Sequence, residues 1–244
     1  MYLPPKPLSR YHRPDLVGLP RRTLWRRAFR CTVRAVCKLA RWSLARTRIE
    51  GLEHLPRKGP AILVTNHLGD ADVVLILSVL PWCPEVLASI DLLEYRWIFW
   101  LLHAYGVIWV HRGRADLAAL KAALKALQEG RVLAVAPEGR QSLIGGLMPG
   151  TEGAAYLALK SGAPVVPIGI TGTFNWQVFP RLKRFQRLDF GIRIGPPFRV
   201  QPQAQDRREA LKEATETIMR AIARMLPPEY RGVYADEAAV EPGN

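Results

Sequence analysis

The sequence predicts an α/β protein, built on a mostly parallel mixed sheet flanked by helices. From Ile49 onward, short apolar runs rich in β-branched residues alternate with longer segments of helical period. This alternation is typical of a sheet covered on both faces. The length of 244 residues, with 49% hydrophobic and 23% charged residues, suits one substantial core. No internal repeat and no linker interrupts the chain between Ile49 and Leu226.

The chain begins with two segments that differ from the rest. Residues 1–20 are rich in proline and polar groups and are predicted to be irregular. Residues 21–48 hold ten Lys and Arg and no acidic residue. Apolar residues recur there every three or four positions and predict an amphipathic helix with one apolar and one basic face. We therefore expect three regions: 1–48 as lead-in and basic helix, 49–234 as the main domain, and 235–244 as a polar tail.

The remaining elements follow from apolar runs and their end signals. Asp91 is a plausible N-cap for a very apolar helix, and Gly130 and Gly162 are expected to end two others. The predicted strands are 61–65, 86–90, 107–110, 132–136, 164–170 and 190–194. The predicted helices are 71–80, 92–105, 116–129, 152–160 and 207–225.

The charge of the chain implies an anionic partner. The 35 Lys and Arg against 21 Asp and Glu give a net charge of +14, which attracts nucleic acid or an anionic membrane surface. The helix at 21–48 either packs on the domain with its basic face in water, or lies in a membrane interface with arginines on anionic headgroups. A nucleic-acid surface usually exposes residues that stack on bases. Here the aromatics follow the apolar stripe, so we expect a membrane partner and no nucleic acid.

Targeting and metal signals are sparse. The three cysteines, Cys31, Cys37 and Cys83, show no Cys-x-x-Cys spacing, which fits a reducing compartment without a zinc site. We expect no metal and no resident cofactor. The first residues show no apolar signal-peptide core, and no window approaches the ~18 apolar residues of a spanning helix. The expected location is therefore peripheral or monotopic, on the cytoplasmic face of a membrane.

Residues 62–72 carry the strongest chemical signal. A short apolar strand leads into a polar turn that holds His67, and Asp70 and Asp72 follow. A carboxylate on one imidazole nitrogen fixes the tautomer and makes the other nitrogen a better base. Because five residues of a helix rotate by roughly 500°, His67 can pair with Asp72 only if it precedes the helix. Gly69 makes such a turn easy, and Asp70 would then lie at the helix N-terminus.

Asn66-His67-x-x-x-x-Asp72 resembles the signature of the glycerolipid acyltransferases typified by 1-acylglycerol-3-phosphate acyltransferase. Three further stretches resemble that family's later blocks in order: 106–112, 137–139 and 165–170. The resemblance covers roughly Ile49 to Tyr234. One departure lies in the third block, which usually reads Glu-Gly-Thr-Arg. Here it reads Glu138-Gly139-Arg140-Gln141, so the arginine comes one position early.

The resemblance implies a reaction. His67 would be the general base and Asp72 its orienting carboxylate. An acyl group would pass directly from acyl-CoA or acyl-carrier protein to a lysophospholipid hydroxyl, most simply that of 1-acylglycerol-3-phosphate to give phosphatidic acid. No Gly-x-Ser-x-Gly motif is present, which agrees with the lack of a protein nucleophile. Backbone nitrogens of residues 67–70 or 138–140 are expected to stabilise the oxyanion.

The same resemblance assigns substrate binding. Arg112 and Arg140 would clamp the acceptor phosphate, as guanidinium geometry suits phosphate oxygens, although either could be an ordinary surface charge. Glu138 would hold a substrate hydroxyl or tether an arginine. His111, beside Arg112, is expected to be a bystander. The full set of expected substrate-binding residues is Asn66, Arg112, Glu138, Gly139 and Arg140.

Two other interpretations remain open at this stage. The acceptor could be a different lysolipid, such as lyso-ornithine lipid. The chain could also be a non-enzymatic basic module for membranes or nucleic acid, with a coincidental histidine–aspartate pair.

Overall fold

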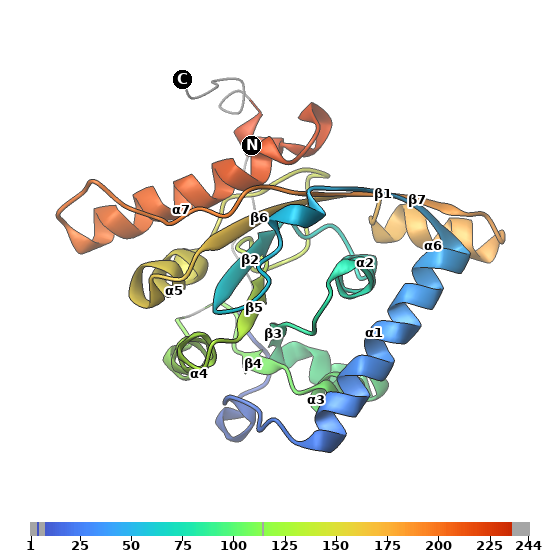
Figure 1. The fold of residues 1–244 in the computed structure, drawn as a ribbon, viewed down its shortest axis with the longest axis horizontal. Coiled ribbons are helices and arrows are strands. Elements are labelled where there is room, and N and C mark those ends of the chain that lie inside the picture. The colour runs from blue at the N-terminus through green and yellow to red at the C-terminus, as the bar shows by residue number, and fades with distance from the viewer. Residues whose placement is uncertain (1–3, 5–7, 114, 236–244) are drawn as a thin grey trace.

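The computed structural model describes residue 4, residues 8–113 and residues 115–235, and its centre is a seven-stranded sheet (Figure 1). The strand order is β1-β7-β6-β2-β5-β3-β4, and β6 and β7 form the one antiparallel neighbour pair in it. The predicted mostly parallel mixed sheet is therefore confirmed. The strands are β1 Ala45–Glu50, β2 Ala61–Thr65, β3 Glu85–Ser89, β4 Ile108–Val110, β5 Val132–Val135, β6 Val165–Thr171 and β7 Leu188–Ile194.

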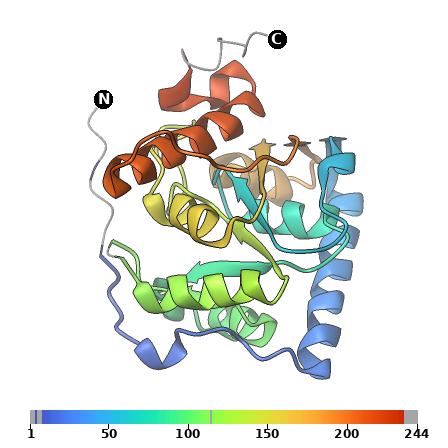
Figure 2. The ribbon, with the colours of Figure 1, turned by 60° about the vertical axis from the view of Figure 1, so that its left-hand side comes forward.

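Helices cover both faces of the sheet. Figure 2 shows α4, α5 and α7 stacked along one face, and these helices share a core with β2, β5 and β6. α1, α2, α3 and α6 lie toward the other face, where two further apolar clusters fill the space. Central strands such as β2 are buried on both sides, which explains their continuous apolar sequence. The helices are α1 Leu24–Leu44, α2 Ala71–Val79, α3 Arg96–Tyr105, α4 Leu117–Gln128, α5 Glu152–Ser161, α6 Asn175–Lys183 and α7 Arg207–Arg224.

Several sequence expectations need correction. α6 has no counterpart among the predicted elements, because it contains Pro180, and an internal proline usually argues against a helix. Asp91 is not a helix N-cap. It lies in a 3-10 turn and accepts hydrogen bonds from the N-terminal segment, at Ser9 Oγ and the backbone nitrogen of Arg10. The expected boundary between residues 48 and 49 falls inside β1, which pairs in parallel with β7. Of the expected tail, residues 236–244 lie outside the described residues.

α1 is amphipathic as predicted, but several of its arginines face the protein. Arg26 donates to the carbonyl oxygen of Ala104, and Arg34 donates to those of Leu80 and Pro81. These arginines therefore hold the helix on the domain and are not available to lipid headgroups. Most side chains turned outward are apolar, with Trp25 and Trp42 62% and 73% exposed, and the basic Arg27 and Lys38 are exposed among them. Within the described residues, no helix is long and apolar enough to cross a membrane.

A buried ion cluster fixes α1 in this orientation. Glu85 at the start of β3 is fully buried and accepts hydrogen bonds from Arg30 at 3.0 and 2.7 Å. Arg131 reaches the same carboxylate at 3.2 Å. Burial favours a raised pKa for Glu85, but these arginines outweigh that effect and hold its pKa below the usual value. The cluster thus joins α1, β3 and the residue before β5, which are distant in sequence.

Candidate active site

The candidate site lies along the edge where β2, β5, β3 and β4 end. These strands are parallel neighbours, so their carboxyl ends meet at one edge of the sheet. In open α/β sheets this edge is where ligands bind. His67 follows β2, Glu138 follows β5 and Arg112 follows β4. The order of strands therefore spreads the predicted residues along the edge from the histidine to the arginine.

His67 and Asp72 form the predicted pair. His67 lies in the turn before α2, and its Nδ1 is 2.7 Å from Oδ2 of Asp72. The same carboxylate oxygen accepts hydrogen bonds from the backbone nitrogens of Leu68 and Gly69 at 2.7 and 3.1 Å. Among the described residues, Nε2 of His67 has no hydrogen-bond partner, and the side chain is 21% exposed. The ring is thus held at one nitrogen and open at the other, which is the arrangement of a general base.

Glu138 stabilises this turn by hydrogen bonds to backbone nitrogens. Its carboxylate is fully buried and accepts from the backbone nitrogens of His67 at 2.8 Å and Met148 at 2.9 Å. Burial raises the pKa of Glu138 to about 7, against the opposing effect of the two N–H donors. The expected contact of Glu138 with a substrate hydroxyl does not fit this geometry. The residue joins two loops, and sequence alone could not supply its partner at Met148.

A polar network closes the turn on its outer side. Asp70 stands at the N-terminus of α2, as expected, and its carboxylate bonds Gln141 at 2.8 Å and Asn175 at 3.2 Å. Oδ1 of Asn175 in turn accepts from the backbone nitrogen of Asp70 at 2.9 Å. Gly69 presses against this segment, where an added Cβ would collide with the carbonyl oxygen of Thr173. None of these contacts was predicted, because they join segments up to 105 residues apart.

Asn66 and Gly139 have structural roles. Asn66 is buried, and its carboxamide donates to the carbonyl oxygen of Ile170 at 2.9 Å and accepts from the nitrogen of Ile170 at 2.8 Å. The expected substrate contact is therefore replaced by a clasp between β2 and β6. Gly139 has a φ of 68°, in the left-handed region that favours glycine. Its nitrogen donates to Ala136, so it holds a tight turn.

Arg112 and Arg140 lie close enough to influence each other. Burial lowers the pKa of Arg112, the charge of Asp91 opposes this, and the charge of Arg140 lowers it further. Among the described residues, the guanidinium of Arg112 makes no hydrogen bond, and that of Arg140 reaches only the carbonyl oxygen of Pro4, at 3.4 Å. Arg140 therefore lies within electrostatic range of Arg112. Gln141, at the family's usual arginine position, bonds Asp70 instead.

The N-terminal segment runs over this arginine pair. Ser9 exchanges two hydrogen bonds with the backbone of Arg112, at 3.2 and 2.7 Å. The backbone nitrogen of Arg13 donates to Nε2 of His111 at 3.1 Å. The predicted irregular lead-in therefore contributes to the site.

His111 has the same spacing to an aspartate as His67. Its Nδ1 is 2.7 Å from Oδ2 of Asp116, which also caps α4. However, its side chain is only 5% exposed, and its Nε2 is occupied by Arg13. Both imidazole nitrogens are therefore engaged inside the protein. The prediction that His111 is a bystander agrees with this geometry.

Most of the backbone nitrogens that were expected to stabilise the oxyanion already donate hydrogen bonds within the protein. The backbone nitrogens of residues 67–70 are all engaged, with Glu138, Asp72 or Asn175 as acceptors. The nitrogen of Gly139 is also engaged. Within the described residues, those of Glu138 and Arg140 have no hydrogen-bond acceptor. Because the nitrogen of Ser142 donates to the carbonyl oxygen of His67 at 2.7 Å, this turn lies against the histidine turn.

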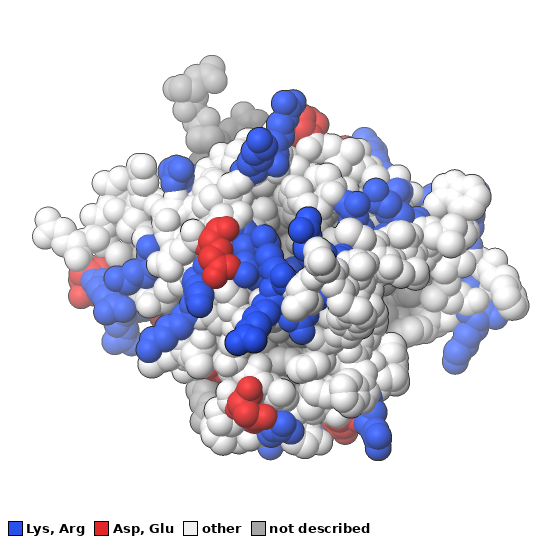
Figure 3. Space-filling view, turned by 60° about the horizontal axis from the view of Figure 1, so that its bottom comes forward, with Lys and Arg blue, Asp and Glu red and all other residues white. Residues whose placement is uncertain are grey.

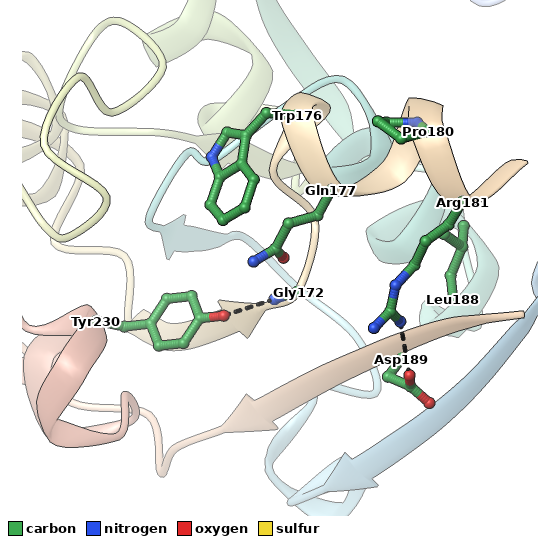
Figure 4. A pocket seen from close by; sticks show the side chains of 8 residues that line it. All are labelled: Gly172, Trp176, Gln177, Pro180, Arg181, Leu188, Asp189 and Tyr230. Carbon is green, nitrogen blue, oxygen red and sulfur yellow. Dashed lines mark hydrogen bonds and ion pairs between the residues drawn. The ribbon is translucent and has the colours of Figure 1, made fainter. Parts of the chain in front are cut away.

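A cavity of about 470 Å³ lies beside α6 (Figure 4). It is bounded by α6, the start of β7 and Tyr230, whose hydroxyl accepts from the nitrogen of Gly172 at 3.2 Å. Trp176 and Gln177 of α6 line it, directly after the Asn175 that bonds Asp70. No predicted site residue falls on this cavity.

Comparison with known proteins finds acyltransferases of similar sequence. A sequence model described as Acyltransferase matches residues 46–171. The chain is 32% identical over 149 residues to the 1-acyl-sn-glycerol-3-phosphate acyltransferase of Borreliella burgdorferi, covering 59% of each chain. It is 27% identical over 194 residues to human 1-acyl-sn-glycerol-3-phosphate acyltransferase alpha, covering 77% of this chain and 67% of that one.

A solved structure shares the fold. The 1-acyl-sn-glycerophosphate acyltransferase PlsC from Thermotoga maritima aligns with a TM-score of 0.62 at 24% identity, over 81% of this chain and 79% of that one. The family match includes β1, the histidine turn and the Glu138 turn, and it ends at the last residue of β6. On the sequence match, the chain belongs to the acyltransferase family.

Proposed function

We propose that the chain transfers a fatty acyl group from acyl-CoA or acyl-carrier protein to the free hydroxyl of a lysophospholipid. The preferred acceptor is 1-acylglycerol-3-phosphate, and the product is phosphatidic acid. One observation carries the proposal: His67 is anchored through Nδ1 by Asp72, while Nε2 is left unpaired among the described residues. The names of the relatives support the acceptor class.

The chemistry follows from this anchored histidine. Nε2 takes the proton of the acceptor hydroxyl as its oxygen attacks the thioester carbonyl. The carbon–sulfur bond then breaks, and the thiol leaves with the proton that His67 returns. Asp72 stabilises the imidazolium between these steps. Base assistance of this kind accelerates a reaction by ~10²–10⁴-fold. No metal or resident cofactor takes part in this scheme.

The arginine pair would bind the acceptor phosphate. Arg112 and Arg140 bring two positive charges together at the same edge of the sheet as His67. A phosphate would relieve their repulsion and accept hydrogen bonds from both guanidinium groups. The free backbone nitrogen of Arg140 would at the same time suit the oxyanion. Lyso-ornithine lipid, which has no phosphate, would gain little from this pair.

The decisive test combines two measurements on the full chain. Thiol release from acyl-CoA and from acyl-carrier protein is followed with and without a mixed lysolipid pool, and the lipid products are identified by mass spectrometry. Acceptor-dependent release with phosphatidic acid as the product supports the proposal. Phosphate-free products would show that the acceptor belongs to another lysolipid class. Release that no acceptor stimulates would contradict the enzyme interpretation in favour of a basic binding module.

We further propose that the chain acts as a peripheral protein on the cytoplasmic face of an anionic membrane. The outward side of α1 exposes apolar residues, as does α3, where Trp97 and Trp100 are exposed. Lys and Arg gather on the face where α3 and the N-terminal end of α1 lie (Figure 3). Exposed aromatics with cations nearby suit a lipid interface. Deleting residues 1–46 would also remove Arg30, a partner of the buried Glu85, so point substitutions such as Trp42→Ala are the better test in vesicle sedimentation.

A further inference from the structure

The turn between α6 and β7 carries an unusual combination of exposed residues. Phe185 is 100% exposed, and Phe179 on the preceding helix turn is 49% exposed. Lys183, Arg184 and Arg187 flank Phe185 in the sequence and are exposed as well. These five residues are called the α6 tip below. No acidic residue lies between Asn175 and Leu188.

The backbone conformation of Phe185 is unusual for a residue with a side chain. The nitrogens of Phe185 and Gln186 donate to the carbonyl oxygens of Leu182 and Arg181, which is the helix ending usually closed by a left-handed glycine. Phe185 adopts that left-handed conformation, with a φ of 55°. A side chain is disfavoured there. Since the ring is fully exposed, packing inside the fold does not explain the choice of residue.

The tip adjoins the exposed side of α1. Arg187 donates to the carbonyl oxygen of Trp42 at 3.3 Å, and the Trp42 ring is itself exposed. Figure 1 shows α6 beside the C-terminal end of α1, at the β1–β7 edge of the sheet. Among the described residues, the side chains of Lys183 and Arg184 have no hydrogen-bond or ion-pair partner. The tip thus extends the apolar surface of α1 and adds unpaired cations to it.

We propose that the α6 tip is a second membrane contact, in which Phe185 and Phe179 enter the interface of an anionic bilayer and Lys183 and Arg184 bind its headgroups. Aromatic residues beside cations are the composition of interfacial anchors. Two contacts, at α1 and at the tip, fix the orientation of the domain on the lipid surface. The inference rests on the proposed function, in that the enzyme works on a membrane.

The experiment measures binding of the full chain, without substrates, to vesicles. One set holds equal parts of phosphatidylcholine and phosphatidylglycerol, and the other phosphatidylcholine alone. Phe185→Gly is the main variant, because glycine suits the left-handed position and keeps the fold intact. We expect about tenfold weaker binding to both sets. Lys183→Gln and Arg184→Gln should each weaken binding about fivefold, on the anionic vesicles only.

Matched controls test whether removing any exposed apolar or charged side chain weakens vesicle binding. Leu117→Ala removes an exposed apolar residue from α4, and Lys212→Gln removes a charge from α7. Both should bind vesicles like the unmodified chain. The thermal midpoint of Phe185→Gly should equal or exceed that of the unmodified chain, which excludes misfolding as the cause of lost binding.

Three outcomes overturn the proposal in different ways. If Phe185→Gly binds normally while Trp42→Ala does not, α1 alone contacts lipid. If the unmodified chain does not bind vesicles, both proposed membrane contacts are wrong. The acyl transfer is then tested separately, by thiol release with a dispersed short-chain lysolipid. If the tip variants bind vesicles normally but need more acyl-carrier protein for half-maximal rate, the tip docks an acidic donor protein.

Discussion

Glu138 accepts a hydrogen bond from the backbone nitrogen of His67 at 2.8 Å, so the end of β5 holds the turn that follows β2. Burial raises the pKa of this carboxyl to about 7, above its usual value of 4.5. Between these two values the folded chain keeps a proton that the unfolded chain has lost. We therefore expect the free energy of unfolding to fall by roughly 3 kcal/mol as pH rises from about 4.5 to 7.

The matched variant is Glu138→Gln, which cannot ionise. Its free energy of unfolding, measured by urea titration across this pH range, should lack the downward contribution seen in the unmodified chain. An equal slope in both proteins would show that Glu138 is already ionised in the fold, stabilised by the nitrogens of His67 and Met148.

Removal of the base should abolish turnover selectively. We expect His67→Ala to lower kcat for acceptor-dependent thiol release by ~10²–10⁴-fold, because no other group takes the hydroxyl proton. Asp72→Asn should cause a similar loss, since Nδ1 of His67 loses its anionic partner. The internal control is His111→Asn, which alters the second histidine–aspartate pair. If it remained folded yet lost as much activity as His67→Ala, the assignment of the base would be wrong.

The arginine pair should govern acceptor affinity. Arg112→Ala and Arg140→Ala each remove charge-assisted hydrogen bonds to the phosphate, so we expect KM for 1-acylglycerol-3-phosphate to rise roughly 10- to 100-fold. The response to a phosphate-free lysolipid should hardly change. Arg224, an exposed cation at the end of α7, supplies the control for general charge loss. An unchanged KM in both variants would exclude this phosphate site.

Gly69 should be intolerant of a side chain. A Cβ there would strike the carbonyl oxygen of Thr173 and crowd Asn175, so the histidine turn must move. Displacements of about 1 Å can lower rates by ~10²-fold, and we expect such a fall in kcat for Gly69→Ala. Gly18→Ala, where an added Cβ meets nothing within 4 Å, should be neutral in the same assay.

The buried ion cluster should set the stability of α1. Arg30→Met leaves the buried Glu85 carboxylate with weaker compensation, and breaking such pairs costs about 3–5 kcal/mol. Because the pKa of Glu85 is lowered in the fold, its contribution is present at neutral pH and is lost as pH falls through that lowered pKa. Equilibrium unfolding of Arg30→Met and Arg30→Met/Glu85→Gln should show the double variant to be the more stable of the two.

Local features of the sequence predicted the mixed sheet and the pairing of His67 with Asp72. Alternating apolar runs indicated the mixed sheet, because strand burial depends on each strand's own composition. His67 and Asp72 are five residues apart, so turn geometry sufficed to pair them. The family resemblance rested on short motifs of the same kind. α6 was missed because Pro180 lies inside it, and proline usually interrupts a helix.

Only the tertiary structure decided which groups meet across the fold. Asn66 and Glu138 were expected to touch substrate, but each is buried and bonded to backbone that is distant in sequence. The helical period of α1 revealed two faces without saying which one is inside, and Glu85 settled that by binding Arg30. Packing determines such pairings, because they depend on which strands become neighbours. The sequence alone therefore indicated the histidine–aspartate pair that we propose as the base and its partner, and the fold supplied the support of that pair, the arginine pair and the surfaces turned outward.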